Sequence, residues 1–342
     1  MSQFKINSIT DKTGTSGPVI AGISTNKSTG CMIIPAGPTE NRGGRGRNIT
    51  YGGAVPSPLA YKSDMNTMDI ATLGSAVEFG DGSKANTFSS GMASSTRGVF
   101  KQGRVPSGGP FVDTMEFVIF SSLGGVTDFG SDTGPSQDSS ASSSDGILGI
   151  IGNGTSYDAT IRSINIATTG NTTTFGTLAS GRYMGGGAGG ASPTRGYFFG
   201  GLVSGQPAGE KIIESVSFAS GGAATKFGDL TVGRRAIAAV TNNTRAVMCS
   251  GDTPSTDTMD YITMASEGNA TDFGNITNQQ GGYGAGGSSA TRGLISGCSP
   301  SNYNRIDYIT IASTGNAQDF GDTTYGSYIN GACSDSHGGL GE

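Results

Sequence analysis

Arginine and acidic residues recur at matching places along this chain. Arg97, Arg245 and Arg292 each open a short apolar run, and the following runs carry Glu116, Asp260 and Asp307. A guanidinium and a carboxylate can join through two parallel hydrogen bonds. We therefore predict that each arginine meets the acid of its own copy across two strands. Two roles stay open for these residues: pairs that fix the strand register, and a ring of arginines that binds a ligand.

Two middle copies depart from the pattern. The third has Ser144-Asp145-Gly146 where others have Thr-Arg-Gly, and Ser163 and Ser215 stand at the acid position. Arg162 is next to Ser163, in the copy that lacks the arginine. This inverted exchange supports the prediction that the arginine and the acid are partners.

A serine-rich segment at residues 131–146 contains Asp132, Asp138 and Asp145. Carboxylates in one loop could hold calcium, but the D-x-D-x-D-G spacing of a calcium loop is missing. A solvated loop is the other interpretation, and calcium binding stays open.

Three tyrosines lie in or near predicted turns: Tyr183, Tyr197 and Tyr283. An exposed aromatic ring can stack on a sugar, and a buried one packs in the core. Acids from several loops could also form the carboxylate pair of a glycoside hydrolase. Both uses stay open as alternatives.

The sequence has few of the residues and motifs that other catalytic sites need. His337 is the only histidine, and no G-x-S-x-G or phosphate-binding G-x-x-x-x-G-K-[ST] motif occurs. Gly185, Gly187 and Gly190 match G-x-G-x-x-G, but no helical pattern follows them. We predict no catalytic residue, no cofactor site and no metal site, and a protein that is not an enzyme.

The composition limits the partners. The net charge is −5, which disfavours binding to nucleic acid. No apolar run approaches the length of about 18 residues that a membrane span needs, so we expect no membrane insertion. The four cysteines are widely scattered and are expected to be thiols.

The dipeptide Phe-Gly recurs at intervals of about 50 residues and sets the architecture. Its six copies are Phe79-Gly80, Phe129-Gly130, Phe175-Gly176, Phe227-Gly228, Phe273-Gly274 and Phe320-Gly321. Each copy has alternating β-branched runs and glycine-rich turns, which favour four short strands. The sequence therefore predicts an all-β protein, a β-propeller with six blades.

Residues 42–342 resemble kelch repeats. The likeness rests on glycines after the second strand (Gly52-Gly53, Gly200-Gly201 and Gly297), an acidic and aromatic third strand, and Phe where kelch domains often have Trp. Blade 1 has a poor first strand, and a strand-like segment remains near the C-terminus. We expect the C-terminal strand to pair with the N-terminal strands and close the ring, leaving no open edge.

Residues 1–41 do not fit the repeat and are predicted to be an extended arm for attachment. The candidate docking residues are Phe4, Ile6, Ile9, Val19 and Ile20. The amino-acid sequence from Ile6 to Arg47, followed by repeats such as Asp307 to Asp322, resembles that of virion structural proteins of marine tailed bacteriophages.

This resemblance implies a non-enzymatic component of the virion, in the tail, a tail fibre or the particle surface, assembled in the cytoplasm of the bacterial host. The partners would be other virion proteins, through residues 1–41 and a propeller face, with host-surface glycan or protein on the free face. The alternatives are a carbohydrate-binding or glycan-degrading propeller, and an internal tail connector without host contact.

Overall fold

The computed structural model describes residues 46–336, except 57, 107–108, 136–137, 153, 186–188, 278–281, 298–303 and 329, and also residues 24–25 and 32–33. The chain divides into two units, Met1–Asn41 and Arg42–Glu342. In the first unit, β1 (Ser24–Thr25) pairs with β2 (Met32–Ile33) in antiparallel fashion.

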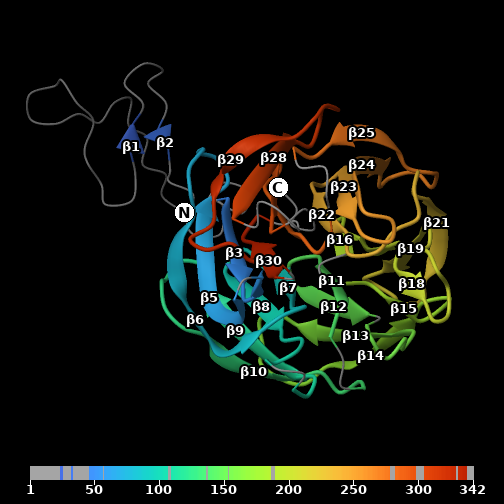
Figure 1. The fold of residues 1–342 in the computed structure, drawn as a ribbon, viewed down its shortest axis with the longest axis horizontal. Coiled ribbons are helices and arrows are strands. Elements are labelled where there is room, and N and C mark those ends of the chain that lie inside the picture. Colours follow the sequence, from blue (N-terminus) through green and yellow to red (C-terminus); the bar gives the residue numbers. More distant parts are fainter. Residues whose placement is uncertain are drawn as a thin grey trace, which may run out of the picture. The chain divides into compact units, whose positions relative to one another are not determined.

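The second unit is a six-bladed β-propeller. Six small antiparallel sheets surround a common axis (Figure 1), and no helix occurs among the residues that the structure describes. This confirms the prediction of an all-β fold with six blades. In each blade, four strands lie side by side from the axis to the outer edge.

The strands of each blade are given from the axis outward. Blade 2 holds β7 (Ser90–Ala93), β8 (Arg97–Lys101), β9 (Thr114–Ile119) and β10 (Thr127–Ser131). Blade 3 holds β11 (Ala141–Ser144), β12 (Leu148–Gly152), β13 (Thr160–Asn165) and β14 (Thr173–Thr177). Blade 4 holds β16 (Gly189–Ala191), β17 (Arg195–Phe199), β19 (Ile212–Ser217) and β21 (Thr225–Asp229). Blade 5 holds β22 (Ala238–Thr241), β23 (Arg245–Gly251), β24 (Thr256–Thr263) and β25 (Thr271–Asn275). Blade 6 holds β26 (Ala285–Ser288), β27 (Arg292–Ser296), β28 (Arg305–Thr310) and β29 (Gln318–Asp322).

Blade 1 is built from both ends of the propeller sequence. Its strands are β30 (Gly331–Ser334), β3 (Arg47–Tyr51), β5 (Leu59–Asp69) and β6 (Val77–Asn86). The innermost strand, β30, pairs with β3 from Asn48↔Ser334 to Tyr51↔Gly331. The innermost strand of blade 1 therefore comes from the C-terminal part of the chain, and the ring has no open edge.

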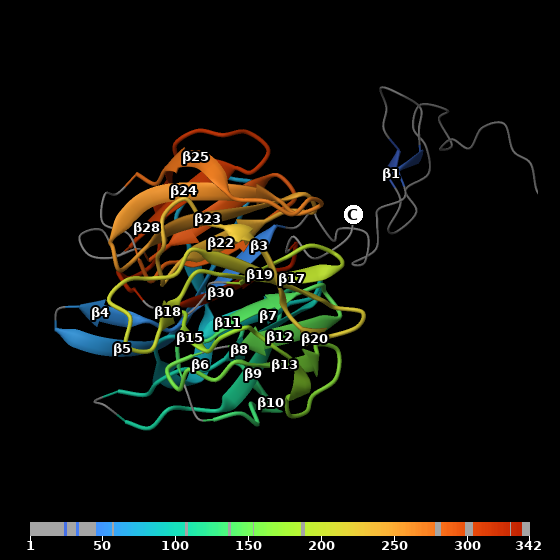
Figure 2. The ribbon, with the colours of Figure 1, turned by 90° about the vertical axis from the view of Figure 1, so that its right-hand side faces the viewer.

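The antiparallel order gives the propeller two different faces. The turn face carries the tight turns between first and second strands and between third and fourth strands. The loop face carries the longer connections, including the hairpin of β4 (Ala54–Pro56) and β5, which projects to one side in Figure 2. Three further short strands are β15 (Arg182–Tyr183), its partner β18 (Leu202–Val203), and β20 (Gly222–Ala223).

The Phe-Gly dipeptides lie where neighbouring blades meet. In five of these joints, the phenylalanine carbonyl accepts a hydrogen bond of 2.7 to 3.1 Å from a glycine N–H in the outer turn of the next blade. In the remaining joint, Gly176 of β14 pairs with Gly222 of β20. A Cβ on the Phe-Gly glycine would lie 1.9 to 2.6 Å from the facing carbonyl oxygen in all six joints. The repeated dipeptide is thus explained by close backbone approach between blades.

Candidate functional site

The repeated arginines and acids lie on opposite faces of their sheets. Arg97 lies opposite Ile119 on β9, whereas Glu116 lies opposite Phe100. Three register positions separate Arg97 from Glu116, and an odd number places the two side chains on opposite faces. The predicted Arg97–Glu116 pair is therefore wrong. The same register separates the other two predicted pairs, Arg245–Asp260 and Arg292–Asp307.

Each of these arginines contacts the next blade. Arg97 Nη1 donates to the carbonyl oxygen of Ile166 at 2.9 Å, and its guanidinium lies 4.1 Å from the centre of the Phe117 ring. Arg245 and Arg292 make the matching contacts, with the carbonyls of Ile311, Ala312, Ile70 and Ala71 and the rings of Tyr261 and Tyr308. These arginines are used to join blades on the turn face.

The acids form a second, buried set of contacts between blades. Asp260 accepts hydrogen bonds from the backbone N–H and Oγ1 of Thr231, at 3.2 and 2.5 Å. Thr231 follows the Phe-Gly of the preceding blade by three residues, and Thr277 bonds to Asp307 in the same way. The equivalent residue is polar and buried in every blade: Asn66, Glu116, Arg162, Glu214, Asp260 and Asp307.

Two of these acids have arginine partners that the sequence analysis does not single out. Arg234 Nη1 lies 2.8 Å from Asp260 Oδ2, and neither side chain is exposed. Arg182 pairs with Glu214 and is equally buried. Both arginines lie in the connections between blades, outside the strands that the repeat makes recognisable.

In the third and fourth copies, the buried position is one residue earlier than predicted. Arg162 and Glu214 occupy it, while Ser163 and Ser215 follow. Arg162 pairs with Asp132 and with Asp158, each at 2.6 Å.

The predicted exchange between Asp145 and Arg162 is also wrong. Asp145 Oδ1 accepts hydrogen bonds from the backbone N–H groups of Ile147 and Leu148, at 2.8 and 2.7 Å, and so closes a turn. Leu148 stands at the first position of β12, where the other five blades have arginine at the first position of the second strand.

The acids of segment 131–146 have separate partners. Asp132 pairs with Arg162, and Asp138 Oδ2 lies 2.9 Å from Arg104 Nε. Within the described part of the chain, no group of three or more His, Cys, Asp or Glu side chains is placed to hold a metal ion.

Lys101, at the end of β8, is buried close to Asp132 and Asp138. Burial lowers the pKa of its ammonium to about 8, because the attraction of the two carboxylates only partly offsets the loss of hydration. The folded state therefore binds this proton less tightly than the unfolded state does. Stability should rise with pH between about 8 and 10.5 from this group.

Replacing Lys101 with methionine should stabilise the protein at pH 7, by up to about 3 kcal/mol, because the ammonium no longer has to be buried, while Asp132 and Asp138 keep their arginine partners. Urea unfolding from pH 7 to 9.5 would measure the effect, and the rise above pH 8 should be lost in the variant. Lys84→Met, at an exposed lysine, serves as the control. A less stable Lys101→Met protein would show that the ammonium is a net partner of the two acids.

Three aromatic side chains from alternate blade connections meet over the axis on the loop face. Phe88 precedes blade 2, Tyr183 precedes blade 4 and Tyr283 precedes blade 6. The ring of Phe88 lies 6.4 Å from that of Tyr183 and 5.9 Å from that of Tyr283, edge to face in both cases. All three side chains are half-buried. We refer to them, together with Arg235 and Asp252, as the axial cluster.

Arg235 and Asp252 supply the charges of the axial cluster. Their Nη2 and Oδ2 atoms are 3.0 Å apart, and the Arg235 guanidinium lies 4.8 Å from the Tyr183 ring. Burial disfavours the Asp252 carboxylate, but hydrogen bonds from Arg235 and others outweigh it and hold its pKa below the usual range. Burial also raises the pKa of Tyr283, whose hydroxyl donates to Asp252 Oδ2 at 3.1 Å.

The axial cluster has the chemistry of a binding surface. It offers aromatic rings beside an ion pair whose side chains are 23% and 25% exposed. Two of the three tyrosines for which sugar stacking and core packing stayed open, Tyr183 and Tyr283, lie in it. The third, Tyr197, is fully buried and donates to the carbonyl oxygen of Met264 in blade 5.

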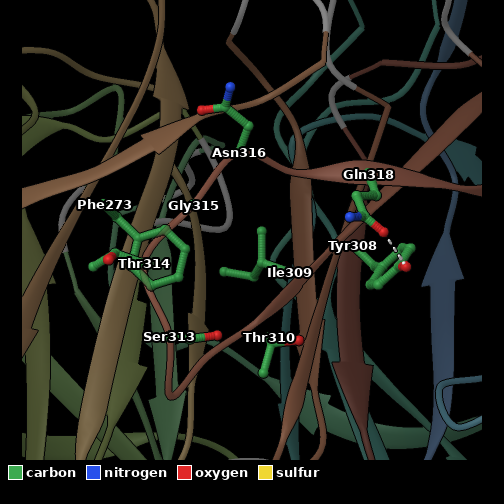
Figure 3. A pocket seen from close by; sticks show the side chains of 9 residues that line it. All are labelled: Phe273, Tyr308, Ile309, Thr310, Ser313, Thr314, Gly315, Asn316 and Gln318. Atoms are coloured by element: carbon green, nitrogen blue, oxygen red, sulfur yellow. Dashed lines mark hydrogen bonds between the residues drawn. The ribbon is translucent and has the colours of Figure 1, made fainter.

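Shallow pockets lie at the outer edges of the joints. The pocket in Figure 3 has a volume of about 220 Å³ and lies between Phe273 of blade 5 and the outer turn of blade 6. Tyr308 and Gln318 share a hydrogen bond at its side. Pockets of about 150 and 340 Å³ occupy the equivalent places in blade 5 and between blades 2 and 3. Because equivalent residues line all three, we attribute these pockets to the repeat itself.

The predicted docking residues Phe4, Ile6, Ile9, Val19 and Ile20 lie outside the described residues, as does His337.

No protein-family model matches the chain, and a search of curated protein sequences gives no match. The described residues contain no helix that is long and apolar enough to cross a membrane.

Proposed function

We propose that this protein is a non-enzymatic structural component of a tailed-phage virion, which residues 1–41 attach to the particle. The proposal draws on the resemblance of residues 1–41, which we call the leader, and of the repeats to virion proteins of marine tailed phages. One structural observation favours it most: the propeller has two different faces, the turn face, where the described chain enters at Gly46, and the loop face, which carries the axial cluster.

The attachment side is defined by Gly46. Its carbonyl oxygen accepts a hydrogen bond of 2.6 Å from the N–H of Ile70, which begins an outer turn of blade 1. The described chain therefore enters the propeller at Gly46, on its turn face. The loop face, with its longer connections, stays available for a host-surface glycan or protein.

A carbohydrate-binding propeller is the second candidate, and the axial cluster is the observation that favours it. Tyr183 and Tyr283 present aromatic rings next to the Arg235–Asp252 pair, a combination that suits a sugar ring and its hydroxyl groups. This binding is compatible with the virion role, because a glycan on the host cell would be its ligand.

The leader is the decisive test of the virion proposal. Deleting residues 1–41 should leave a folded propeller that is missing from purified particles, as measured by circular dichroism and by mass spectrometry of the particles. A truncated protein that is incorporated as well as the full chain would contradict attachment through the leader. A full chain that is absent from particles would contradict the virion role. A cryo-electron map of the particle that shows the propeller contacted on both faces by other particle proteins would identify an internal connector.

A further inference from the structure

Exposed apolar side chains are concentrated on the turn face of three consecutive blades. We call the following five residues the apolar patch: Leu73 (60% exposed) and Val77 (60%) in blade 1, Ile119 (37%) and Leu123 (66%) in blade 2, and Ile147 (69%) in blade 3. Large exposed apolar groups on a soluble protein commonly mark an interaction site when they lie together.

The repeat provides an internal control for this patch. At the position of Leu73 and Leu123, before the turn glycine, blades 4 to 6 have Gly221, Glu267 and Thr314. At the position of Val77, they have Thr225, Thr271 and Gln318. At the position of Ile119, they have Ser217, Thr263 and Thr310, and at that of Ile147 they have Thr194, Thr244 and Thr291. The fold is built equally well with small or polar residues at all these positions, so packing of the blades does not require the apolar ones.

Contacts between blades place the patch residues next to one another. The N–H groups of Gly124 and Val126 donate to the carbonyls of Phe79 and Asp81, so the turn that carries Leu123 lies along β6, which begins at Val77.

A similar chain of contacts joins blades 2 and 3. Ile119 lies opposite Arg97, which donates to the carbonyl of Ile166. The N–H of Ile166 in turn donates to the carbonyl of Ile147. The patch residues of blades 1 to 3 therefore lie on segments that meet at the two joints between these blades.

The described chain enters the propeller on the same face, at Gly46. Gly46 is bonded to Ile70, three residues before Leu73, and residues 1–45 precede it. Because the leader is covalently continuous with Gly46, a protein that binds it would be tethered to the propeller, and a weak contact with the patch would then add to the overall affinity.

We propose that the apolar patch is a second docking surface for the same particle protein that holds the leader, and that this protein presents an apolar surface to it. This inference rests on the proposed function. It assigns the turn face of blades 1 to 3 to the particle and leaves the loop face free.

The test uses a full-length variant in which each patch residue is replaced by threonine, the residue that blades 5 or 6 carry at most of these positions. The substitutions are Leu73→Thr, Val77→Thr, Ile119→Thr, Leu123→Thr and Ile147→Thr. Leu59→Thr is the matched control, since Leu59 is 64% exposed in the hairpin of the loop face. Each gene replaces the original in the phage, and the copy number per particle is measured by quantitative mass spectrometry. Thermal unfolding of the purified proteins checks that each variant folds.

We expect the five-threonine variant to melt like the original and to fall at least tenfold in copy number, with Leu59→Thr unchanged. An unchanged copy number for the five-threonine variant would overturn the inference. That result would not contradict the proposed function, provided that deletion of the leader still abolishes incorporation. Sedimentation of the purified proteins tests a different occupant of the patch. If the unsubstituted protein were a dimer, the five-threonine variant a monomer, and both were incorporated equally, the patch would join copies of this chain and the inference would be overturned. If the original protein is itself absent from particles, the proposed function fails, and the inference fails with it.

Discussion

Replacing Asp260 with alanine is expected to lower the free energy of unfolding by about 3 to 5 kcal/mol. Arg234 and Asp260 are fully buried and 2.8 Å apart, so the substitution leaves a guanidinium charge without its carboxylate. It also removes the acceptor of two hydrogen bonds from Thr231, in the connection that enters blade 5. Urea unfolding followed by far-ultraviolet circular dichroism would measure the loss.

An exposed ion pair in β21, the outer strand of blade 4, gives the control. Lys226 and Asp229 are 2.8 Å apart, but their side chains are 57% and 35% exposed. Asp229→Ala should therefore cost no more than about 1 kcal/mol. If the two alanine variants were equally stable, the buried pair would not be the strong contact between blades 4 and 5 that its geometry indicates.

Replacing Gly228 with alanine is expected to destabilise the protein by about 3 kcal/mol or more. The added Cβ would lie 1.9 Å from the carbonyl oxygen of Gly268 and 2.5 Å from its carbonyl carbon. These are backbone atoms, which cannot turn aside as a flexible side chain can, so blades 4 and 5 must separate.

The facing glycine provides a matched control in the same joint. A Cβ on Gly268 would meet no atom within 4 Å, so Gly268→Ala should change the stability by less than about 1 kcal/mol. Thermal unfolding of both variants would compare them directly. Equal melting temperatures would show that the joint can open enough to take a methyl group, and the explanation of the Phe-Gly repeat would fail.

The number of blades could be predicted because each joint between blades needs a glycine at the Phe-Gly position. The backbone of the next blade lies too close to that position for any side chain, so the dipeptide recurs in every copy. The partners of the charged residues could not. Tyr261 and Asp260 are neighbours in sequence but point to opposite faces of β24, and matching copies by residue type cannot resolve a shift of one residue. In the third and fourth copies, this shift of one residue assigned Ser163 and Ser215 to the acid position, which Arg162 and Glu214 occupy in the structure.

A signal for the buried contacts was present in the sequence. Four copies read Phe-Gly-x-x-Thr, ending at Thr133, Thr231, Thr277 and Thr324. The last three threonines bond to the buried polar residue of the next blade, whereas Thr133 bonds to Thr172 there. The axial cluster had no comparable signal. Phe88 and Tyr283 lie in connections of variable length, so only the closed ring brings them together.

The pairing of β30 with β3 also determines the order of events when the chain is made. The backbone N–H of Arg47 bonds to the carboxylate of Asp335, 288 positions later, so blade 1 lacks its inner strand until β30 has left the ribosome. Loop closure over such a distance makes this the natural last step of folding. A product that terminates early would keep an unpaired strand edge, which cellular proteases and chaperones recognise. Closure of the ring therefore depends on synthesis of residues 331–334.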